Sequence, residues 1–230
     1  MSEAGIAMRR TVAVGLLAPL LFTAAGCGSG DGKNAEDRAE RTCRTLLGED
    51  GVAWAETHSP QEAGPEQAED VASAKDRFYR DARSWTADAE QAPPRSDTEV
   101  CRIGMRAANP YKRRLSLSYG ASTFPFDFPF GEKVSEGVPQ VVFPVSSDVK
   151  LVARQLNGFT AYFVYVKCLV PGAPAGQENG APLQGALTDS LVNNAGLREY
   201  LTYLLRSAGT VAKQFGCRNR PVVPATLPKP

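Results

Sequence analysis

The spacing of apolar residues changes twice along this chain, and this restricts the folds that the chain can adopt. From Val71 to Ala89, apolar side chains recur every three or four residues, the period of one helix face. Between Glu99 and Leu169 several segments have a period of two, which indicates strands, and from Leu197 to Phe215 the helical period returns. Helices, then strands, then a helix, without strand-helix alternation, predict an α+β domain with helices packed on one face of an antiparallel sheet.

Two helices are predicted before the strands. Asn34 is placed to cap the first, and Gly48 is placed to end it. After a loop, the second begins near Pro65 and stops at Pro93. Its expected apolar face consists of Val71, Ala74, Phe78, Ala82, Trp85 and Ala89.

We expect an antiparallel sheet of about four to five strands. Residues 101–105 and 115–119 alternate on either side of the turn signal Asn109-Pro110 and predict one strand pair. Residues 138–145 contain four valines, but Pro139 and Pro144 cannot donate to a ladder, so this segment is at best an edge strand.

The clearest hairpin signal is Asn157-Gly158, which favours a type I′ turn between 149–156 and 159–169. A two-residue turn would place one set of side chains on the core face: Val149, Leu151, Ala153, Tyr162, Val164, Val166 and Cys168. The opposite face would be half apolar and either covered or available for binding: Phe159, Phe163, Tyr165, Lys150, Arg154 and Lys167.

The C-terminal part is predicted to contain one loop, one helix and a tail. Residues 171–185 form a loop rich in glycine and proline. The helix from Leu197 to Phe215 has a sustained apolar stripe and ends at Gly216. Residues 218–230, with four prolines, indicate an extended tail, so that the single folded domain spans residues 36–217.

The N-terminus carries the pattern of a secretory signal over residues 1–26. Arg9 and Arg10 precede an apolar run from Thr11 to Ala25. At 15 residues, and interrupted by Pro19, the run is shorter than the ~20 residues that a membrane-spanning helix needs. We therefore interpret it as a targeting segment of an exported protein.

The end of this signal, Ala25-Gly26-Cys27, resembles the bacterial lipoprotein box, although Ala24 stands where that family usually has leucine. The resemblance implies a diacylglycerol on Cys27, which becomes the mature N-terminus and the contact with the membrane. Residues 27–35 would then be a flexible tether at the outer face of the cytoplasmic membrane. The alternative is ordinary cleavage after Ala25, with Cys27 left as a free thiol.

The remaining cysteines agree with export. Without Cys27, four of the five are left, and in an oxidising compartment four thiols can pair in three ways. We expect Cys43 with Cys101 and Cys168 with Cys217, because each pair would tie a helix to a strand near it in the chain. With no C-x-x-C motif and a single histidine, the sequence predicts no metal site and no cofactor.

The charge balance argues against nucleic acid as a partner, since the net charge is +1. The charges are nevertheless divided: residues 36–99 carry 16 acidic and 8 basic side chains, net −8, and residues 100–230 carry 7 and 15, net +8. Either the acidic helices neutralise a basic sheet, or a basic face contacts an anionic partner such as wall polymer or lipid headgroups. The focus of such a face would be Lys112, Arg113 and Arg114, with Arg154 and Lys167.

Four phenylalanines form a second candidate binding segment. Phe124, Phe126, Phe128 and Phe130 lie within seven residues and alternate with two prolines. Exposed, they would form an apolar patch for a ligand or protein partner. The alternative is that alternate rings close the end of the core.

The chain lacks the G-x-S-x-G, H-E-x-x-H and phosphate-loop motifs of common enzyme families. Its one histidine, His58, lies in a polar loop. The sequence therefore favours a non-enzymatic exported lipoprotein that binds a ligand or partner. The alternatives are an accessory envelope protein that contacts anionic polymer or lipid, and a hydrolase with an unrecognised site around His58.

Overall fold

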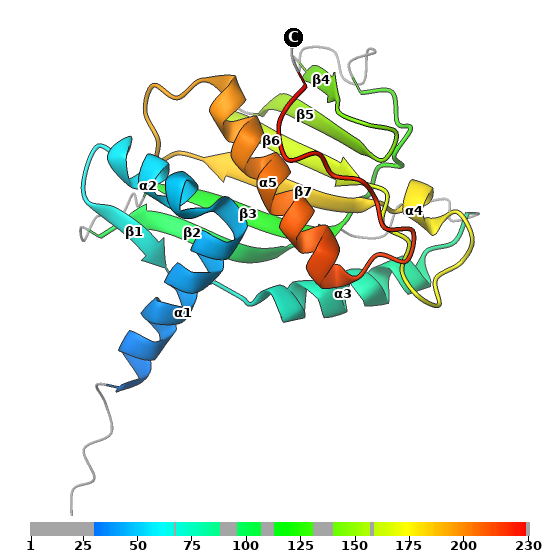
Figure 1. Cartoon of the computed structure of the whole chain (residues 1–230), viewed down its shortest axis with the longest axis horizontal. Helices are drawn as coiled ribbons and strands as arrows, with labels where there is room; N and C mark the ends of the chain where they lie inside the picture. Colours follow the sequence, from blue (N-terminus) through cyan, green and yellow to red (C-terminus); the bar gives the residue numbers. More distant parts are fainter. Residues whose placement is uncertain are drawn as a thin grey trace, which may run out of the picture.

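The structure is a computed structural model that describes residues 30–66, 68–87, 96–106, 113–130, 140–156 and 159–228. Seven strands form one antiparallel sheet in the order β1-β2-β3-β7-β6-β5-β4 (Figure 1). The strands are β1 (Ala63–Glu66), β2 (Thr98–Met105), β3 (Arg114–Ala121), β4 (Gln140–Pro144), β5 (Val149–Leu156), β6 (Phe159–Val166) and β7 (Leu183–Asp189). The helices are α1 (Gly30–Leu47), α2 (Glu49–Thr57), α3 (Val71–Ser84), α4 (Gln177–Gly180) and α5 (Leu197–Phe215). The mixed helix-and-sheet class is confirmed, but the expected number of strands was too low.

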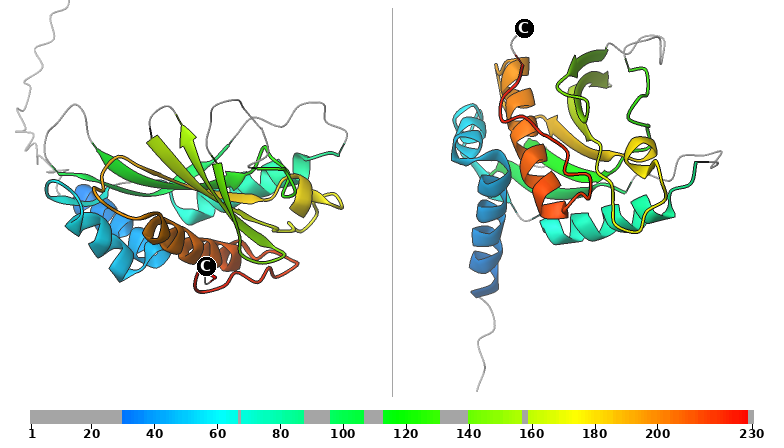
Figure 2. Two further views of the ribbon diagram at one scale, coloured as in Figure 1. Left: turned by 90° about the horizontal axis from the view of Figure 1, so that it is seen from above. Right: turned by 45° about the vertical axis from the view of Figure 1, so that its right-hand side comes forward.

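The main core lies between one face of the sheet and helices α1, α2, α3 and α5 (Figure 2). Phe78 of α3 meets Phe215 of α5 with ring centroids 5.7 Å apart. Tyr119 of β3 is fully buried, and its hydroxyl lies 2.5 Å from the Ser207 hydroxyl of α5. Burial raises the pKa of Tyr119, so this hydroxyl stays protonated and available for the hydrogen bond.

Both expected disulfides are present. Cys43 of α1 is joined to Cys101 of β2, with Cα atoms 5.1 Å apart. Cys168, just after β6, is joined to Cys217, just after α5, with Cα atoms 4.9 Å apart. The first bond links a helix to a strand, and the second joins the segments that directly follow a strand and a helix.

The predicted strand pairs are confirmed. In β2 and β3, Ile103 lies opposite Leu115, and in β5 and β6, Leu151 lies opposite Val164. The β5–β6 register places the expected side chains in the main core. Strand β4 is at the edge of the sheet, where its proline is tolerated. The turn residues Asn109-Pro110 and Asn157-Gly158 lie outside the described residues.

Two strands were missed. Pro65, which we expected in a helix, lies in β1 at the other edge of the sheet. The expected loop 171–185 contains the short helix α4 and the start of β7, a central strand between β3 and β6. Glycine obscures the period of β7, but Gly185 is needed there: a Cβ atom at this position would lie 2.5 Å from the Tyr119 ring.

The helix boundaries also required correction. Helix α1 begins at Gly30 instead of being capped by Asn34, so residues 30–35 of the expected tether are helical; a helix already formed by the packed turns extends outward at little cost. Helix α2 occupies the stretch that we expected to be a loop. Helix α3 begins after Asp70, whose side chain accepts a hydrogen bond of 2.7 Å from the Ser73 amide.

The last helix ends as predicted, because Gly216 adopts a φ of 69° that glycine tolerates best. The chain then returns beside α5 (Figure 1). Residues 217–228 are therefore not a free tail: Val223 and Leu227 pack against the main core.

Candidate functional site

A cavity of about 980 Å³ lies between α5 and the C-terminal segment 217–228. Leu205, Gly209 and Ala212 form its floor, since these positions share one face of α5. Pro221, Val223, Pro224 and Ala225 form the opposite wall. We call this cavity the α5 groove. Its apolar surfaces and its size are those of a small-molecule site.

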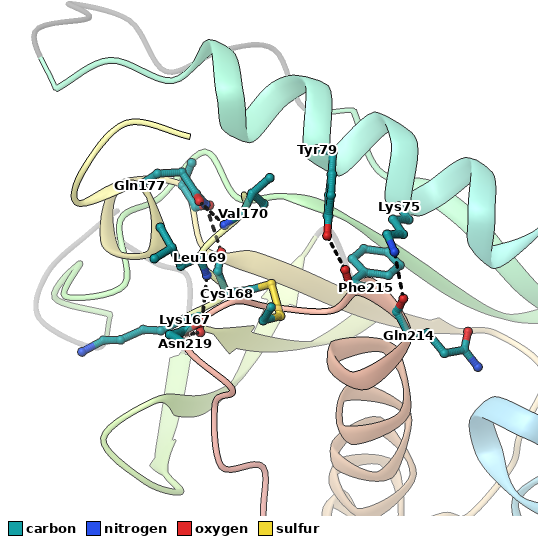
Figure 3. The surroundings of a disulfide bond; sticks show 12 residues. Lys75, Tyr79, Lys167, Cys168, Leu169, Val170, Gln177, Gln214, Phe215 and Asn219 are labelled. Atoms are coloured by element: carbon teal, nitrogen blue, oxygen red, sulfur yellow. Dashed lines mark hydrogen bonds between the residues drawn. A yellow bond between two sulfur atoms is a disulfide. The ribbon is translucent and has the colours of Figure 1, made fainter. Parts of the chain in front are cut away.

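Hydrogen bonds and a disulfide hold the start of the groove wall (Figure 3). Beside the Cys168–Cys217 bond, the Asn219 side chain accepts from the Leu169 amide at 2.9 Å and donates to the Lys167 carbonyl at 2.8 Å. The Arg218 amide also donates to the Leu169 carbonyl at 2.8 Å. The first residues of the groove wall, 217–219, are therefore held in place against residues 167–169.

Residues 167–170, which follow β6, are also held by Gln177, which is fully buried (Figure 3). Its side-chain oxygen accepts from the Val170 amide at 2.9 Å, and its side-chain nitrogen donates to the Cys168 carbonyl at 3.2 Å. The side-chain amides of Gln177 and Asn219 thus supplement the backbone hydrogen bonds of residues 167–170 beyond β6.

Helix α3 holds the C-terminal end of α5 (Figure 3). The Lys75 ammonium donates to the Gln214 carbonyl at 3.2 Å, and the Tyr79 hydroxyl donates to the Phe215 carbonyl. A cation at a helix C-terminus also interacts favourably with the helix dipole. Burial raises the pKa of Tyr79, which keeps its hydroxyl a donor.

Four basic side chains and no carboxylate are among the described residues lining the α5 groove: Arg206, Lys213, Arg218 and Arg220. Arg206 forms an ion pair with Asp50 of α2 and donates to the Leu47 carbonyl at 3.1 Å. The hydrogen bond from Arg206 lowers the pKa of Asp50. Lys213, Arg218 and Arg220 form no ion pair within the described part of the chain, so the groove keeps an excess of positive charge.

The four predicted phenylalanines lie on the other face of the sheet, where they form a second, smaller core with side chains of β5, β6 and β7. Phe126 and Phe130 are each 8% exposed, and Phe124 and Phe128 are half-buried. The centroids of Phe128 and Phe130 are 4.9 Å apart, and those of Phe130 and Tyr165 are also 4.9 Å apart. The half-apolar face of the hairpin is thus covered by this segment.

Three basic side chains lie over these rings. The Lys150 and Lys167 ammonium groups are each 4.6 Å from the Phe126 centroid. The Arg154 guanidinium is 5.7 Å from the Phe124 centroid and 5.9 Å from that of Phe163. We call Lys150, Arg154 and Lys167 with these rings the cation-aromatic surface.

The predicted basic run is not part of that surface. Arg113 donates to the Ser190 carbonyl and, at 2.9 Å, to the Asn193 side chain, and Arg114 starts β3. This is the end of the sheet at which β7 finishes, whereas Lys167 follows β6 at the opposite end. Lys112 lies outside the described residues, as does Cys27.

His58 follows α2 and lacks a catalytic arrangement in the part of the chain that the structure describes. Its Nδ1 lies 2.8 Å from the Trp54 carbonyl, and its own carbonyl accepts from the Asn193 amide at 3.0 Å. No hydroxyl, thiol or carboxylate of the described residues is hydrogen-bonded to its ring. Nor does any group of three or more His, Cys, Asp and Glu side chains in the described ranges fit a metal ion.

Sequence reasoning missed the residues of the α5 groove. The available signals were Gly209, an unusual residue on the apolar face of a long helix, and the two arginines that flank Asn219 just after a disulfide cysteine. Nothing in the sequence indicated that the proline-rich end would return along α5.

Comparisons of the chain with protein-family models, curated proteins and solved structures found no match. Among the described helices, none is long and apolar enough to cross a membrane. The function therefore has to be argued from the α5 groove, the cation-aromatic surface and the N-terminal sequence.

Proposed function

We propose that this protein is an exported, lipid-anchored, non-enzymatic binding protein whose α5 groove takes an anionic ligand with an apolar portion. The groove carries this proposal, because one cavity of about 980 Å³ is lined by apolar walls and by three cations that form no ion pair with the residues the structure describes. A hydrocarbon segment would remove the half-buried Val223 and Pro224 from water, and an anionic head would pair with Lys213, Arg218 or Arg220.

Export and anchoring are supported by the leader and by the sulfur chemistry. A lipoprotein box ending at Cys27 would leave one diacylglycerol on the mature chain, and two acyl chains hold a domain stably on a membrane. Two disulfides are typical of proteins folded outside the cytoplasm. Mass spectrometry of the native protein should find an acylated N-terminal Cys27; an unmodified Cys27 would refute the anchor.

Fluorescence titration with dansyl-labelled undecanoic acid tests the groove directly. A Cβ atom at Gly209 would lie 3.7 Å from Val223 Cγ1, which is ordinary contact, so alanine fits there without a clash, whereas the longer side chain of leucine would fill the space between α5 and Val223. We expect Gly209→Leu to weaken binding by about tenfold or more, since it occupies the space of the hydrocarbon chain. Gly209→Ala is the matched control and should bind like the wild type.

The charge of the site is tested by replacing Lys213 and Arg218 with glutamine. The double variant should bind the probe several-fold more weakly, with an effect that diminishes at high salt, because the exposed cations are screened. Wild-type affinity in both Gly209→Leu and the double variant would refute the α5 groove as the ligand site.

A further inference from the structure

Within the described residues, the cation-aromatic surface holds an excess of positive charge. Lys150, Arg154 and Lys167 form no ion pair within the described residues, and each lies over a phenylalanine ring. The exposed Asp127 is the carboxylate whose charge acts on Lys150. Among the described residues, these three cations and one carboxylate give the surface a net positive charge.

The three cations form two separate positions. Lys150 lies opposite Tyr165 in the β5–β6 register, and Lys167 follows two residues later, so both ammonium groups share the Phe126 ring. Arg154 is four residues further along β5 on the same face, about 13 Å away at ~3.3 Å per residue. One small anion cannot span that distance, whereas a chain with repeated anionic groups can.

The Lys150–Lys167 position is the stronger of the two for an anion. Burial lowers the pKa of Lys150, and the neighbouring Lys167 lowers it further, against the opposing effect of Asp127. An anion with two free oxygens could accept from both ammonium groups and relieve their repulsion. The phenylalanine rings, which are packed in the smaller core, keep both lysine stems in place.

The place of this surface in the sheet argues against the protein's own membrane as the partner. Helix α1, which continues from the expected anchor, packs against β1 and β2. Strands β5 and β4 form the opposite side of the sheet, far from the start of α1 (Figure 1). If Cys27 carries the anchor proposed above, this surface would face away from the membrane.

We propose that Lys150, Lys167 and Arg154 form a docking surface for an extended polymer with phosphate groups in its backbone. Such a polymer presents two free oxygens at each phosphate and can reach both cation positions at once. The surface lies on the opposite face of the sheet from the α5 groove, so the two sites can be tested separately.

The test is retention of the full-length protein on immobilised, deacylated poly(glycerol phosphate) over a range of salt concentrations. Lys150→Gln with Lys167→Gln should weaken retention by about tenfold and lower the salt slope by about one to two, because two phosphate contacts are lost. Lys150→Arg with Lys167→Arg keeps the charge and should restore binding. Lys213→Gln with Arg218→Gln, in the groove, should leave retention unchanged.

Two results would overturn the proposal. One is unchanged retention of the Lys150→Gln, Lys167→Gln protein, with folding verified by its thermal unfolding. The other is equal dependence on these lysines for binding to phosphatidylglycerol vesicles by protein lacking residues 1–27, which would identify a lipid surface as the partner instead.

Discussion

At the scale of single residues, a close contact between a glycine and a tyrosine limits what the centre of the sheet can accommodate. Gly185 in β7 lies opposite Tyr119 in β3, and the buried Tyr119 ring fills the space that a side chain at Gly185 would need. Moving the ring away would be costly, because it is fully buried and its hydroxyl is hydrogen-bonded to Ser207.

We expect Gly185→Ala to destabilise the protein by about 1 to 3 kcal/mol through overpacking. The added Cβ would lie 2.5 Å from the Tyr119 ring and 2.8 Å from Val164. Urea unfolding measures the change. Gly209→Ala is the control, because its Cβ meets only ordinary contacts and alanine is the better helix former by about 1 kcal/mol. Equal stability of the two variants would contradict this packing.

The phenylalanines of residues 124–130 differ in how deeply they are buried. Phe130 is 8% exposed within the smaller core, whereas Phe128 is half-buried. Phe130→Ala should therefore cost about 3 kcal/mol or more, and Phe128→Ala about half of that. Chemical denaturation measures both values, and a greater loss for Phe128→Ala would show that this order is wrong.

At the scale of helices and strands, α3 begins with a titratable cap. The Asp70 carboxylate accepts from the Ser73 amide, and this hydrogen bond lowers the pKa of Asp70 below its ordinary value of 3.8. The cap therefore stabilises the folded state above the unfolded-state pKa, and this contribution is lost as the pH falls through the lower, folded-state pKa.

Replacing Asp70 with alanine should cost about 1 kcal/mol at neutral pH. The difference from the wild type should shrink as the pH falls below about 4, where the wild-type carboxylate is protonated. Asp70→Asn keeps a capping oxygen and should remove the acid dependence without the neutral-pH loss. Thermal unfolding across this pH range gives the answer, and a constant difference would exclude the cap as its cause.

The sequence predicted those elements whose apolar period is uninterrupted. The β5–β6 hairpin alternates cleanly on either side of Asn157-Gly158, and α5 carries its stripe from Leu197 to Phe215. Strand β7 was missed because Gly185 interrupts its pattern, and the reason for that glycine is Tyr119, a residue 66 positions earlier in the chain. Local patterns cannot reveal a requirement set by such a distant contact.

The candidate sites were predicted less completely than the fold. The phenylalanines were identified as a group, but their burial depends on which face of the sheet the segment covers, and periodicity does not encode this. The α5 groove arises from a chain reversal at Gly216 and the Cys168–Cys217 bond, so no single segment carries its signature.

At the scale of the whole molecule, acidic side chains of residues 36–99 form ion pairs with basic side chains of residues 100–230. Asp50 pairs with Arg206, and Glu36 pairs with Arg106 at 2.9 Å. Part of the charge division is thus neutralised within the fold, while the α5 groove and the cation-aromatic surface remain positive. The two disulfides support different regions of this arrangement.

Removing the disulfides one at a time should separate stability from binding. The bonds span 58 and 49 residues, and loss of either should cost about 4 kcal/mol if the unfolded chain dominates. Only replacement of Cys168 and Cys217 by alanine should also lower the affinity for dansyl-labelled undecanoic acid, because this bond holds the groove wall. Replacement of Cys43 and Cys101 is the matched control, and equal losses of affinity would contradict that role.

The most direct test of ligand binding in the α5 groove is amide chemical-shift mapping during titration with dodecanoate. Our account predicts that the shifts concentrate in residues 205–213 of α5 and 217–225 of the C-terminal segment, and that Gly209→Leu abolishes them. Shifts confined to the face of the sheet that carries Phe126, or the absence of any shift at saturating dodecanoate, would contradict it.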